Sequence, residues 1–196
     1  MTSNKLFGVP VKIVDNCPKN ILAEAKTVAE IERYKSEPTW YGNMTSTFKY
    51  DDNVECNVLQ FSCPLLLEHI HKSVDEYLYE DLNVDPNKNY NVRIVSSWIN
   101  YSTKGMFQEY HMHADTDISG VFYINAVKDS GKIFFRNPSP AVLYHRLTFV
   151  TNEIDSEVSY SPMGGRMLLW PGYLDHMVSK NKSDGERISV TFNIKL

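Results

Sequence analysis

Three histidines and an aspartate have the types and spacing that can bind a metal ion. His111, His113 and Asp115 follow one another at two-residue steps, and His176 lies further along the chain. Residues two apart in a β-strand point to the same side, so both imidazoles would share one face, with Asp115 at the strand end. Two imidazoles and one carboxylate that leave coordination positions open suit non-haem Fe(II). The pattern therefore predicts an iron site to which the distant His176 contributes.

A second group of polar residues can bind a carboxylate. In the segment Arg187–Lys195, Arg187 and Ser189 fall on one face of an alternating strand, and apolar residues fall on the other. Tyr123 and Asn125 share a face in the same way on an earlier strand. A guanidinium offers a two-pronged hydrogen bond to a carboxylate, and a hydroxyl adds a further donor. These residues either face solvent or line a cavity, and in a cavity they suit a small dicarboxylate that also chelates the metal.

The composition is that of an ordinary globular protein, and 196 residues are enough for a substantial core. The formal net charge of −4 argues against a broad nucleic-acid-binding surface, because such surfaces are usually strongly basic. Cys17, Cys56 and Cys63 form no CxxC pair, which favours reduced thiols. The N-terminal residues lack the apolar core of a signal peptide, and no apolar run is long enough to span a bilayer. We therefore expect a cytoplasmic protein, in the host cytoplasm if it is viral.

The elements that must position these residues begin with two predicted helices. Apolar stripes at helical spacing predict the first over Pro18–Lys35 and the second over Pro64–Leu82. A short edge strand interrupted by a proline is expected before them, at Leu6–Val14. The segment Thr39–Asn57, between the helices, is polar and rich in turn residues.

From Asn91 onward the sequence changes to short apolar segments separated by turn residues. Serial short strands of this kind predict an all-β sandwich or barrel, with the two helices packed on one sheet. No linker separates two domains, so residues 1–196 are predicted to form one domain, with a strand and supporting helices in 1–90 and the β core in 91–196. The predicted strands are Val92–Tyr101, Met106–His113, Ser119–Val127, Lys132–Arg136, Leu143–Thr151, Val158–Pro162, Arg166–Trp170, His176–Ser179 and Arg187–Lys195.

Several short motifs follow one another in the order typical of one enzyme family. They are Trp98-Ile-Asn100, His111-Met-His113-Ala114, Ser119-Gly-Val-Phe-Tyr123, Pro171-Gly-Tyr-Leu-Asp-His176 and Arg187-Ile-Ser189-Val-Thr-Phe-Asn193. In this combination the chain resembles the Fe(II)- and 2-oxoglutarate-dependent oxygenases, especially a small group found in bacteria and phages. The resemblance covers about half of the chain, from Arg93 to the end. It implies a mainly β, cupin-like double-stranded β-helix, also called a jelly roll, with N-terminal helices that support it.

The resemblance leaves two sets of iron ligands open. The wider superfamily uses H-x-D and a later histidine, which here would be His113, Asp115 and His176. The smaller group uses H-x-H, which here would be His111, His113 and His176. The interval from Tyr101 to His111 resembles that of prolyl hydroxylases and favours the second set, whereas the negative charge of a carboxylate favours the first. His113 and His176 belong to both sets.

The resemblance also implies cofactors and a reaction. Fe(II) and 2-oxoglutarate would be the cofactors, and the far carboxylate of 2-oxoglutarate would meet Arg187, Ser189 and Tyr123. Tyr101 and Asn125 are assigned to the same cosubstrate site. A dioxygenase of this kind uses O2 to convert 2-oxoglutarate to succinate and CO2 while it hydroxylates a second substrate. We expect no separate catalytic side chain, because the metal and the cosubstrate supply the redox chemistry.

The second substrate and two other functions stay open. No motif identifies the substrate, so a peptidyl proline and a small molecule are both allowed, with Thr39–Asn57 and Pro138–His145 as expected rims of the site. A cupin-like metal-binding module without catalysis fits part of the pattern. So does a three-histidine iron dioxygenase that does not use 2-oxoglutarate. Neither of these needs an arginine and a serine on the last strand, so a test of Arg187 separates them from the first hypothesis.

Overall fold

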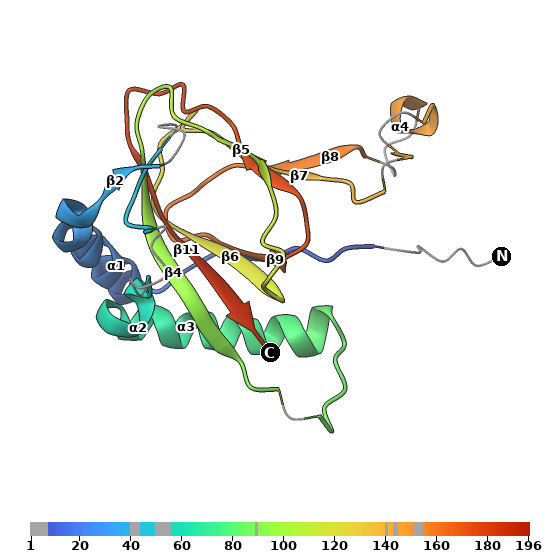
Figure 1. Ribbon diagram of the computed structural model, residues 1–196, viewed down its shortest axis with the longest axis horizontal. Coiled ribbons are helices and arrows are strands. Elements are labelled where there is room, and N and C mark those ends of the chain that lie inside the picture. The colour runs from blue at the N-terminus through green and yellow to red at the C-terminus, as the bar shows by residue number, and fades with distance from the viewer. Residues whose placement is uncertain are drawn as a thin grey trace.

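The computed structural model describes residues 8–39, 44–49, 56–88, 90–139, 141–142, 145–150 and 155–196. The strands of this described part form two antiparallel sheets, and helices cover the outer side of the larger sheet (Figure 1). Residues from both sheets pack together in one apolar cluster, so the sheets face each other. The predicted mainly β jelly roll with N-terminal helices is confirmed. No helix among the described residues combines the length and apolarity needed to cross a bilayer.

The larger sheet brings strands from the whole chain together. Its central strand, β11, pairs with β4 on one side and with β6 on the other. Because all three are antiparallel neighbours, polar residues that are far apart in the sequence meet on one surface. Within the described residues the strand order is β1 (Lys12–Val14), β9 (Met167–Pro171), β6 (Ile118–Asn125), β11 (Arg187–Lys195), β4 (Arg93–Ser102), β3 (Thr45–Ser46) and β2 (Glu37–Pro38).

The smaller sheet carries two of the predicted metal ligands. Its order is β5 (Gln108–His111), β10 (His176–Val178), β7 (Ile133–Arg136) and β8 (Glu157–Tyr160). His111 lies opposite His176 in the pairing of β5 with β10. The sheet pairing therefore brings the first and last histidines of the predicted site side by side.

Both predicted long helices are confirmed. They are α1 (Lys19–Glu32), which continues into a 3-10 turn at Arg33–Lys35, and α3 (Pro64–Glu76), which continues into a π-helical turn at Tyr77–Asp81. A short helix, α2 (Val58–Ser62), precedes α3 and was not predicted. The carboxylate of Glu24 on α1 accepts hydrogen bonds from the first free amides of α3, at 3.1 and 2.9 Å. This contact satisfies amides that have no partner inside the helix and joins the two helices.

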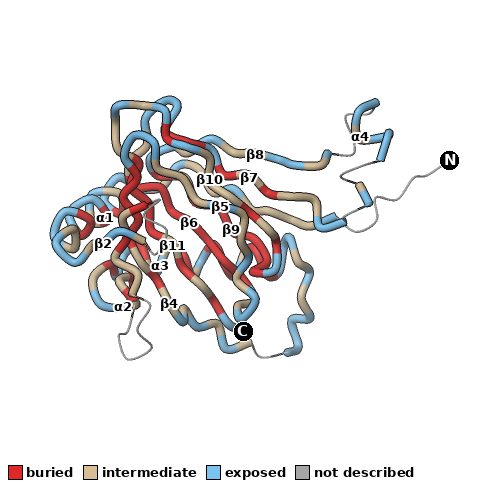
Figure 2. The backbone as a smooth tube through the Cα atoms, turned by 45° about the horizontal axis from the view of Figure 1, so that its top comes forward, coloured by how far each residue is buried: buried red, intermediate tan, exposed pale blue. Residues whose placement is uncertain are grey.

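Alternate residues of the larger sheet enter different apolar cores. Ile99, Phe122 and Val190 point toward the helices and belong to the larger core. Val121 and Leu168 point the other way and pack with residues of the smaller sheet. Figure 2 shows the buried parts of the chain concentrated in the strands of the larger sheet. The space between the sheets, with its smaller core, is where the polar site lies.

The predicted strand Leu143–Thr151 is wrong. Its described part contains a short helix, α4 (Leu147–Val150), whereas residues 143–144 and 151 lie outside the described residues. The helix lies on the long connection between β7 and β8, which reaches away from the body of the protein (Figure 1). Phe149 is 80% exposed, and the amide of Thr148 bonds to the nearby carbonyl of His145. An apolar run becomes a strand only beside a pairing partner, and the described residues offer none here.

Candidate active site

Three histidines meet in the space between the two sheets. One ring nitrogen from each of His111, His113 and His176 lies within 4.8 Å of the other two. The ring centroids of His111 and His176 are 4.3 Å apart because their strands are paired. The ring of His113, two residues beyond β5, has its centroid 5.2 Å from that of His111 and 5.3 Å from that of His176. One ion at about 2.1 Å from each nitrogen fits this spacing after small side-chain adjustments.

Two of the imidazoles are held by backbone carbonyls. Nδ1 of His111 lies 2.8 Å from the carbonyl oxygen of Glu109, and Nδ1 of His176 lies 2.8 Å from that of Leu174. A carbonyl oxygen only accepts hydrogen bonds, so Nδ1 carries the hydrogen in both rings. The lone pair of each ring is therefore on Nε2, where it can bind a metal.

The third imidazole is held by side chains of the larger sheet. Nδ1 of His113 lies 2.6 Å from Oδ1 of Asn193 and 2.9 Å from the hydroxyl of Ser119. Nδ2 of Asn193 donates to the hydroxyl of Ser96 at 3.2 Å, which turns Oδ1 toward the ring. Ser119 also donates to this oxygen, at 3.0 Å. Nδ1 of His113 therefore donates to Asn193, and its Nε2 is left for a metal, as in the other two rings.

Burial keeps these imidazoles neutral. Desolvation lowers the pKa of His111 and of His113 below the usual histidine value. It lowers the pKa of His176 to about 3, and the positive charge that His111 would carry when protonated adds to this effect. The neutral imidazole is the form that binds metals. At neutral pH the cluster thus offers three uncharged nitrogen donors, and they fit a divalent iron ion, for which imidazole is a suitable ligand.

Asp115 lies outside the cluster. It is exposed in the turn that follows His113, and the three histidines are the metal-ligating group found in the part of the chain that the structure describes. The structure thus brings together the H-x-H set of the two sets that the sequence left open. It does not bring Asp115 to the same place, because the chain leaves the strand after His111 and alternation no longer applies.

Arg187 is a buried cation without a carboxylate partner among the described residues. It is 3% exposed, and its Nη1 donates to the carbonyl oxygens of Ser130 at 2.7 Å and Gly131 at 3.2 Å. Its pKa is lowered because burial disfavours the charged form. A buried charge without a counter-charge is costly, and a bound anion would offset that cost.

A cavity of about 430 Å³ joins Arg187 to the three histidines. Tyr123 and Ser189, which lie opposite each other on β6 and β11, also line it. Burial raises the pKa of Tyr123 to about 12, so its hydroxyl keeps its proton and can donate a hydrogen bond. Val121 and Ile133 add apolar walls. The cavity thus combines three histidines that could hold a metal ion, apolar sides and a buried cation, an arrangement that would suit a dicarboxylate.

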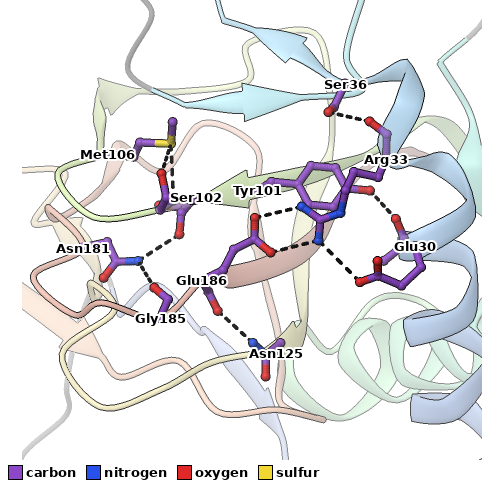
Figure 3. A network of polar contacts seen from close by, with 12 residues as sticks. Glu30, Arg33, Ser36, Tyr101, Ser102, Met106, Asn125, Asn181, Gly185 and Glu186 are labelled. Carbon is purple, nitrogen blue, oxygen red and sulfur yellow. Dashed lines mark hydrogen bonds and ion pairs between the residues drawn. The ribbon is translucent and has the colours of Figure 1, made fainter.

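Tyr101 and Asn125 do not line this cavity, although we assigned them to the cosubstrate site. Tyr101 points toward α1, where its hydroxyl donates to a backbone carbonyl at 2.6 Å and Arg33 covers its ring at 4.4 Å (Figure 3). Asn125 donates to the backbone carbonyl of Glu186 at 2.8 Å. The carboxylate of Glu186 accepts two hydrogen bonds of 2.9 Å from Arg33. This network holds Glu186 in place and so helps to position Arg187, the next residue in the chain.

An aromatic wall borders the histidines on the side of β3 and β4. Phe48 packs edge-on against Trp98 with the ring centroids 4.8 Å apart, and the Trp98 centroid lies 6.2 Å from that of His113. Met44 lines the same part of the cavity, so described residues of the predicted rim Thr39–Asn57 do border it. None of the described residues of the other expected rim, Pro138–His145, is among the lining residues.

The loop that carries His113 depends on a glycine. The amide of His113 donates to the carbonyl of Gly172 at 2.9 Å, and the amide of Gly172 donates to that of Asp117 at 3.0 Å. A Cβ atom at position 172 would collide with Thr116. A glycine there lets the two loops approach closely enough to hold His113 over the cavity.

Comparisons with known proteins identify the family of this chain. Residues 96–193, half of the chain, match the family model described as "Putative 2OG-Fe(II) oxygenase". The chain belongs to the 2OG-Fe(II) oxygenase family. It is therefore an enzyme that uses Fe(II) and 2-oxoglutarate and acts on a further substrate. A comparison with curated protein sequences finds no match.

Solved structures show the same fold. A prolyl-4-hydroxylase from Pseudomonas putida matches with a TM-score of 0.62 and 13% identity, covering 95% of this chain and 92% of that one. The α-ketoglutarate-dependent epimerase SnoN from nogalamycin biosynthesis matches with a TM-score of 0.66 and 12% identity, covering 95% and 76%. HygX from Streptomyces hygroscopicus, with nickel, 2-oxoglutarate and hygromycin B bound, matches with a TM-score of 0.61 and 10% identity, covering 95% and 83%. At these identities the likeness shows a shared fold.

Several residues of this oxygenase that shape the cavity have no role among the expectations from its sequence. Ser119 and Asn193 hold His113, and Asn100 and Trp170 line the cavity with polar atoms that are buried and lack a partner among the described residues. The alternation of side chains along a strand indicates the position of two of them. Ser119 shares the face of Tyr123, and Asn193 shares the face of Arg187.

Proposed function

We propose that His111, His113 and His176 hold the iron of this oxygenase and that Arg187, Ser189 and Tyr123 hold the far carboxylate of 2-oxoglutarate. The observation that carries the proposal is the pairing of two unsatisfied sets in one cavity. Three Nε2 atoms have no hydrogen to donate, and a buried guanidinium has no carboxylate partner among the described residues. A metal satisfies the first set, and an anion satisfies the second.

Spacing along the strands supports this assignment. Ser189 and Asn193 are four residues apart on β11, about 13 Å along the strand. His113 extends from Asn193 into the cavity, and Arg187 enters it beside Ser189. The space between them suits a five-carbon dicarboxylate, in which the two terminal carbons are the carboxylate carbons. Arg187, Ser189 and Tyr123 would orient this molecule so that its keto end faces the histidines.

The neutral donor set also supports the presence of a bound dianion. Three uncharged imidazoles leave the charge of a divalent ion uncompensated, and 2-oxoglutarate brings two negative charges into the cavity. The cosubstrate would therefore be held by attraction at both ends, to the metal site and to Arg187. When bound, Fe(II) and 2-oxoglutarate supply the oxidising chemistry, with O2 as co-reactant.

The aromatic wall supports a hydroxylase whose substrate presents an apolar group. Trp98, Phe48 and Met44 would exclude water next to the histidines and hold a C–H bond there. Both a peptidyl proline and an apolar part of a small molecule suit such a wall. We propose that decarboxylation of 2-oxoglutarate to succinate and CO2 is coupled to hydroxylation of a group bound against this wall.

The first experiment measures binding of 2-oxoglutarate to the iron-loaded protein. Under anaerobic conditions, titration of the Fe(II) protein with 2-oxoglutarate is expected to produce the weak visible charge-transfer band of a chelated keto acid. Arg187→Gln is expected to raise the 2-oxoglutarate concentration at half-saturation by about tenfold or more while iron still binds. The matched control is Arg93→Gln, because Arg93 is exposed at the opposite end of the β4–β11 pair. Iron binding without a band in the unaltered protein would contradict the proposed chelation.

The second experiment separates the two ligand sets. His111→Ala is expected to abolish stoichiometric Fe(II) binding, and Asp115→Ala is expected to leave it within about twofold of the unaltered protein. Metal content after anaerobic loading and gel filtration is the measurement. Retained iron in His111→Ala together with lost iron in Asp115→Ala would instead support the set with a carboxylate.

The three-histidine dioxygenase without 2-oxoglutarate, which the sequence left open, does not agree with the family match. Arg187, which has no carboxylate partner among the described residues, also argues against it, because a cosubstrate carboxylate would explain that residue. Production of succinate from 2-oxoglutarate is the expected outcome that checks this.

A further inference from the structure

A second hollow lies on the other side of the loop that holds Arg187. It has a volume of about 620 Å³ and is lined by residues of three segments, 126–134, 161–163 and 179–182. None of these lining residues, all of them described, lines the cavity that contains the histidines. The two cavities share a wall, because Ser130 and Gly131 border this hollow and also accept the hydrogen bonds of Arg187.

The hollow concentrates positive charge in a chain whose net charge is negative. Four lysines line it, with Asp129 as the only acidic lining residue, and all five are exposed. The salt bridges of the described residues include none of these lysines. The whole chain carries a formal net charge of −4, so this cluster is a local exception. The lysines are Lys128, Lys132, Lys180 and Lys182.

The hollow also has apolar parts and one buried hydroxyl that has no partner among the described residues. Phe134, Pro162 and Met163 form apolar parts of the hollow, and Met163 is 44% exposed. Ser130 is 1% exposed, and its hydroxyl has no hydrogen-bond partner among the described residues. A buried hydroxyl without a partner is uncommon, and Ser130 is part of the wall of this hollow.

We propose that this hollow binds a small organic molecule with two neighbouring phosphate groups. Lysine ammonium groups bind phosphates as mobile point charges, and several of them around one concave surface suit more than one anionic group. The apolar lining would hold the organic part. The hollow is too small and too local for a nucleic-acid strand, which needs a longer basic surface.

Binding in this hollow would affect the 2-oxoglutarate site through the shared loop. Gly131 has a φ angle of 95°, and a Cβ atom at this position would collide with the carbonyl of Ser179 and approach Nη1 of Arg187 at 2.6 Å. The loop is therefore tightly packed against the guanidinium. A ligand that displaces Lys132 or Ser130 would shift the carbonyl oxygens of Ser130 and Gly131, which position Arg187. This consequence rests on the proposed role of Arg187, whereas binding in the hollow does not.

Calorimetric titration of the full chain with inorganic pyrophosphate, without added metal, tests the site. We expect saturable binding that weakens by about tenfold or more in Lys132→Glu/Lys182→Glu. The matched control, Lys26→Glu/Lys72→Glu, makes the same charge change at exposed positions of α1 and α3 and is expected to bind as the unaltered protein does. Inorganic sulfate, with one anionic centre, is expected to bind more weakly than pyrophosphate.

The location is tested with Arg187→Gln and, independently, with excess 2-oxoglutarate. Pyrophosphate binding that persists in both cases places the anion in the hollow. Loss of binding in either case would place it at the cosubstrate end of the first cavity and overturn the proposal. So would equal binding by the lysine variant and its control, or no binding at millimolar pyrophosphate.

The link to catalysis is measured separately. In Fe(II) protein, the half-saturating concentration of 2-oxoglutarate is compared with and without pyrophosphate, in the unaltered protein and in the Lys132→Glu/Lys182→Glu variant. A shift in the unaltered protein that is absent from the variant supports the link. Binding in the hollow without such a shift leaves the site in place and removes the link, and a failure of 2-oxoglutarate to bind at all would contradict the proposed function instead.

Discussion

The two faces of the larger sheet differ although the same strands build both. On the face toward the helices, β4, β6 and β11 contribute apolar side chains such as Ile99, Phe122 and Val190, all fully buried. On the face toward the smaller sheet the same strands contribute buried polar residues such as Ser119, Ser189 and Arg187. One face therefore contributes to the larger apolar core, and the other carries the residues of the proposed active site.

The difference shows how a two-sheet fold accommodates a polar site. Alternation puts neighbouring residues of one strand on opposite faces, so a change at one position leaves the chemistry of the next almost untouched. Burial of apolar side chains in the helix-facing core stabilises the fold, whereas burial of Arg187 is unfavourable for its charge. Substitutions on the two faces should accordingly separate stability from activity, and the four predictions below test that separation in order of decreasing effect.

The largest expected effect is on activity, from the polar face. His176→Ala is expected to lower succinate production to below about one thousandth, because one of the three proposed metal donors is lost. Its urea midpoint is expected to fall less than that of the apolar-face variant Phe192→Ala, because the imidazole borders the cavity even though it also packs against Trp170. Turnover and urea unfolding on the same preparation are the measurements. A large drop in stability with iron binding retained would contradict the separation of the two faces.

The next effect is on stability, from the apolar face. Phe192→Ala is expected to lower the free energy of unfolding by about 3–5 kcal/mol, because a fully buried ring is replaced by a cavity. Phe192 packs over Gly120, where a side chain would collide with the ring. The folded fraction is expected to keep its iron stoichiometry and its affinity for 2-oxoglutarate. Loss of iron from folded protein would show that the faces are coupled.

A smaller effect comes from pH, through the histidines. The folded protein holds His176 with a pKa of about 3, whereas the unfolded chain has the usual value near 6.5, so the unfolded state binds more protons between these values. In the metal-free protein, the contribution of His176 to the free energy of unfolding is therefore fully present above pH 6.5 and decreases as the pH drops toward 3. The decrease is about 2 kcal/mol at pH 5 for this residue alone. Urea unfolding at pH 7 and pH 5 measures it. His176→Gln should lose less stability on acidification, and an equal loss would assign the effect to other groups.

The smallest effects are expected for two tyrosines that lie on opposite faces of the larger sheet. Tyr101→Phe removes a hydrogen bond to α1 and is expected to cost about 1 kcal/mol of stability with no change in the KM for 2-oxoglutarate. Tyr123→Phe removes a donor from the cavity and is expected to raise that KM about fivefold. Steady-state kinetics and urea unfolding of both variants give the comparison. A higher KM in Tyr101→Phe alone would reverse the assignment of the two faces.

Much of this arrangement follows from the sequence alone. Periodicity predicted α1, α3 and most strands, because apolar stripes at helical or strand spacing must be buried to be stable. It also placed Arg187, Ser189 and Tyr123 on one side of their strands. The order of short motifs indicated the oxygenase family, which the family match then showed.

The tertiary structure decided what depends on turns and on contacts between distant segments. His111 meets His176 through the pairing of β5 with β10, and Asp115 is excluded because the chain turns after His113. Tyr101 faces the helices together with Ile99, two residues before it on β4, whereas its interval to His111 says nothing of the side on which it lies. The strand expected at Leu143–Thr151 failed for lack of a neighbour. Local pattern fixes which residues share a face, but only packing of the whole chain fixes what that face meets.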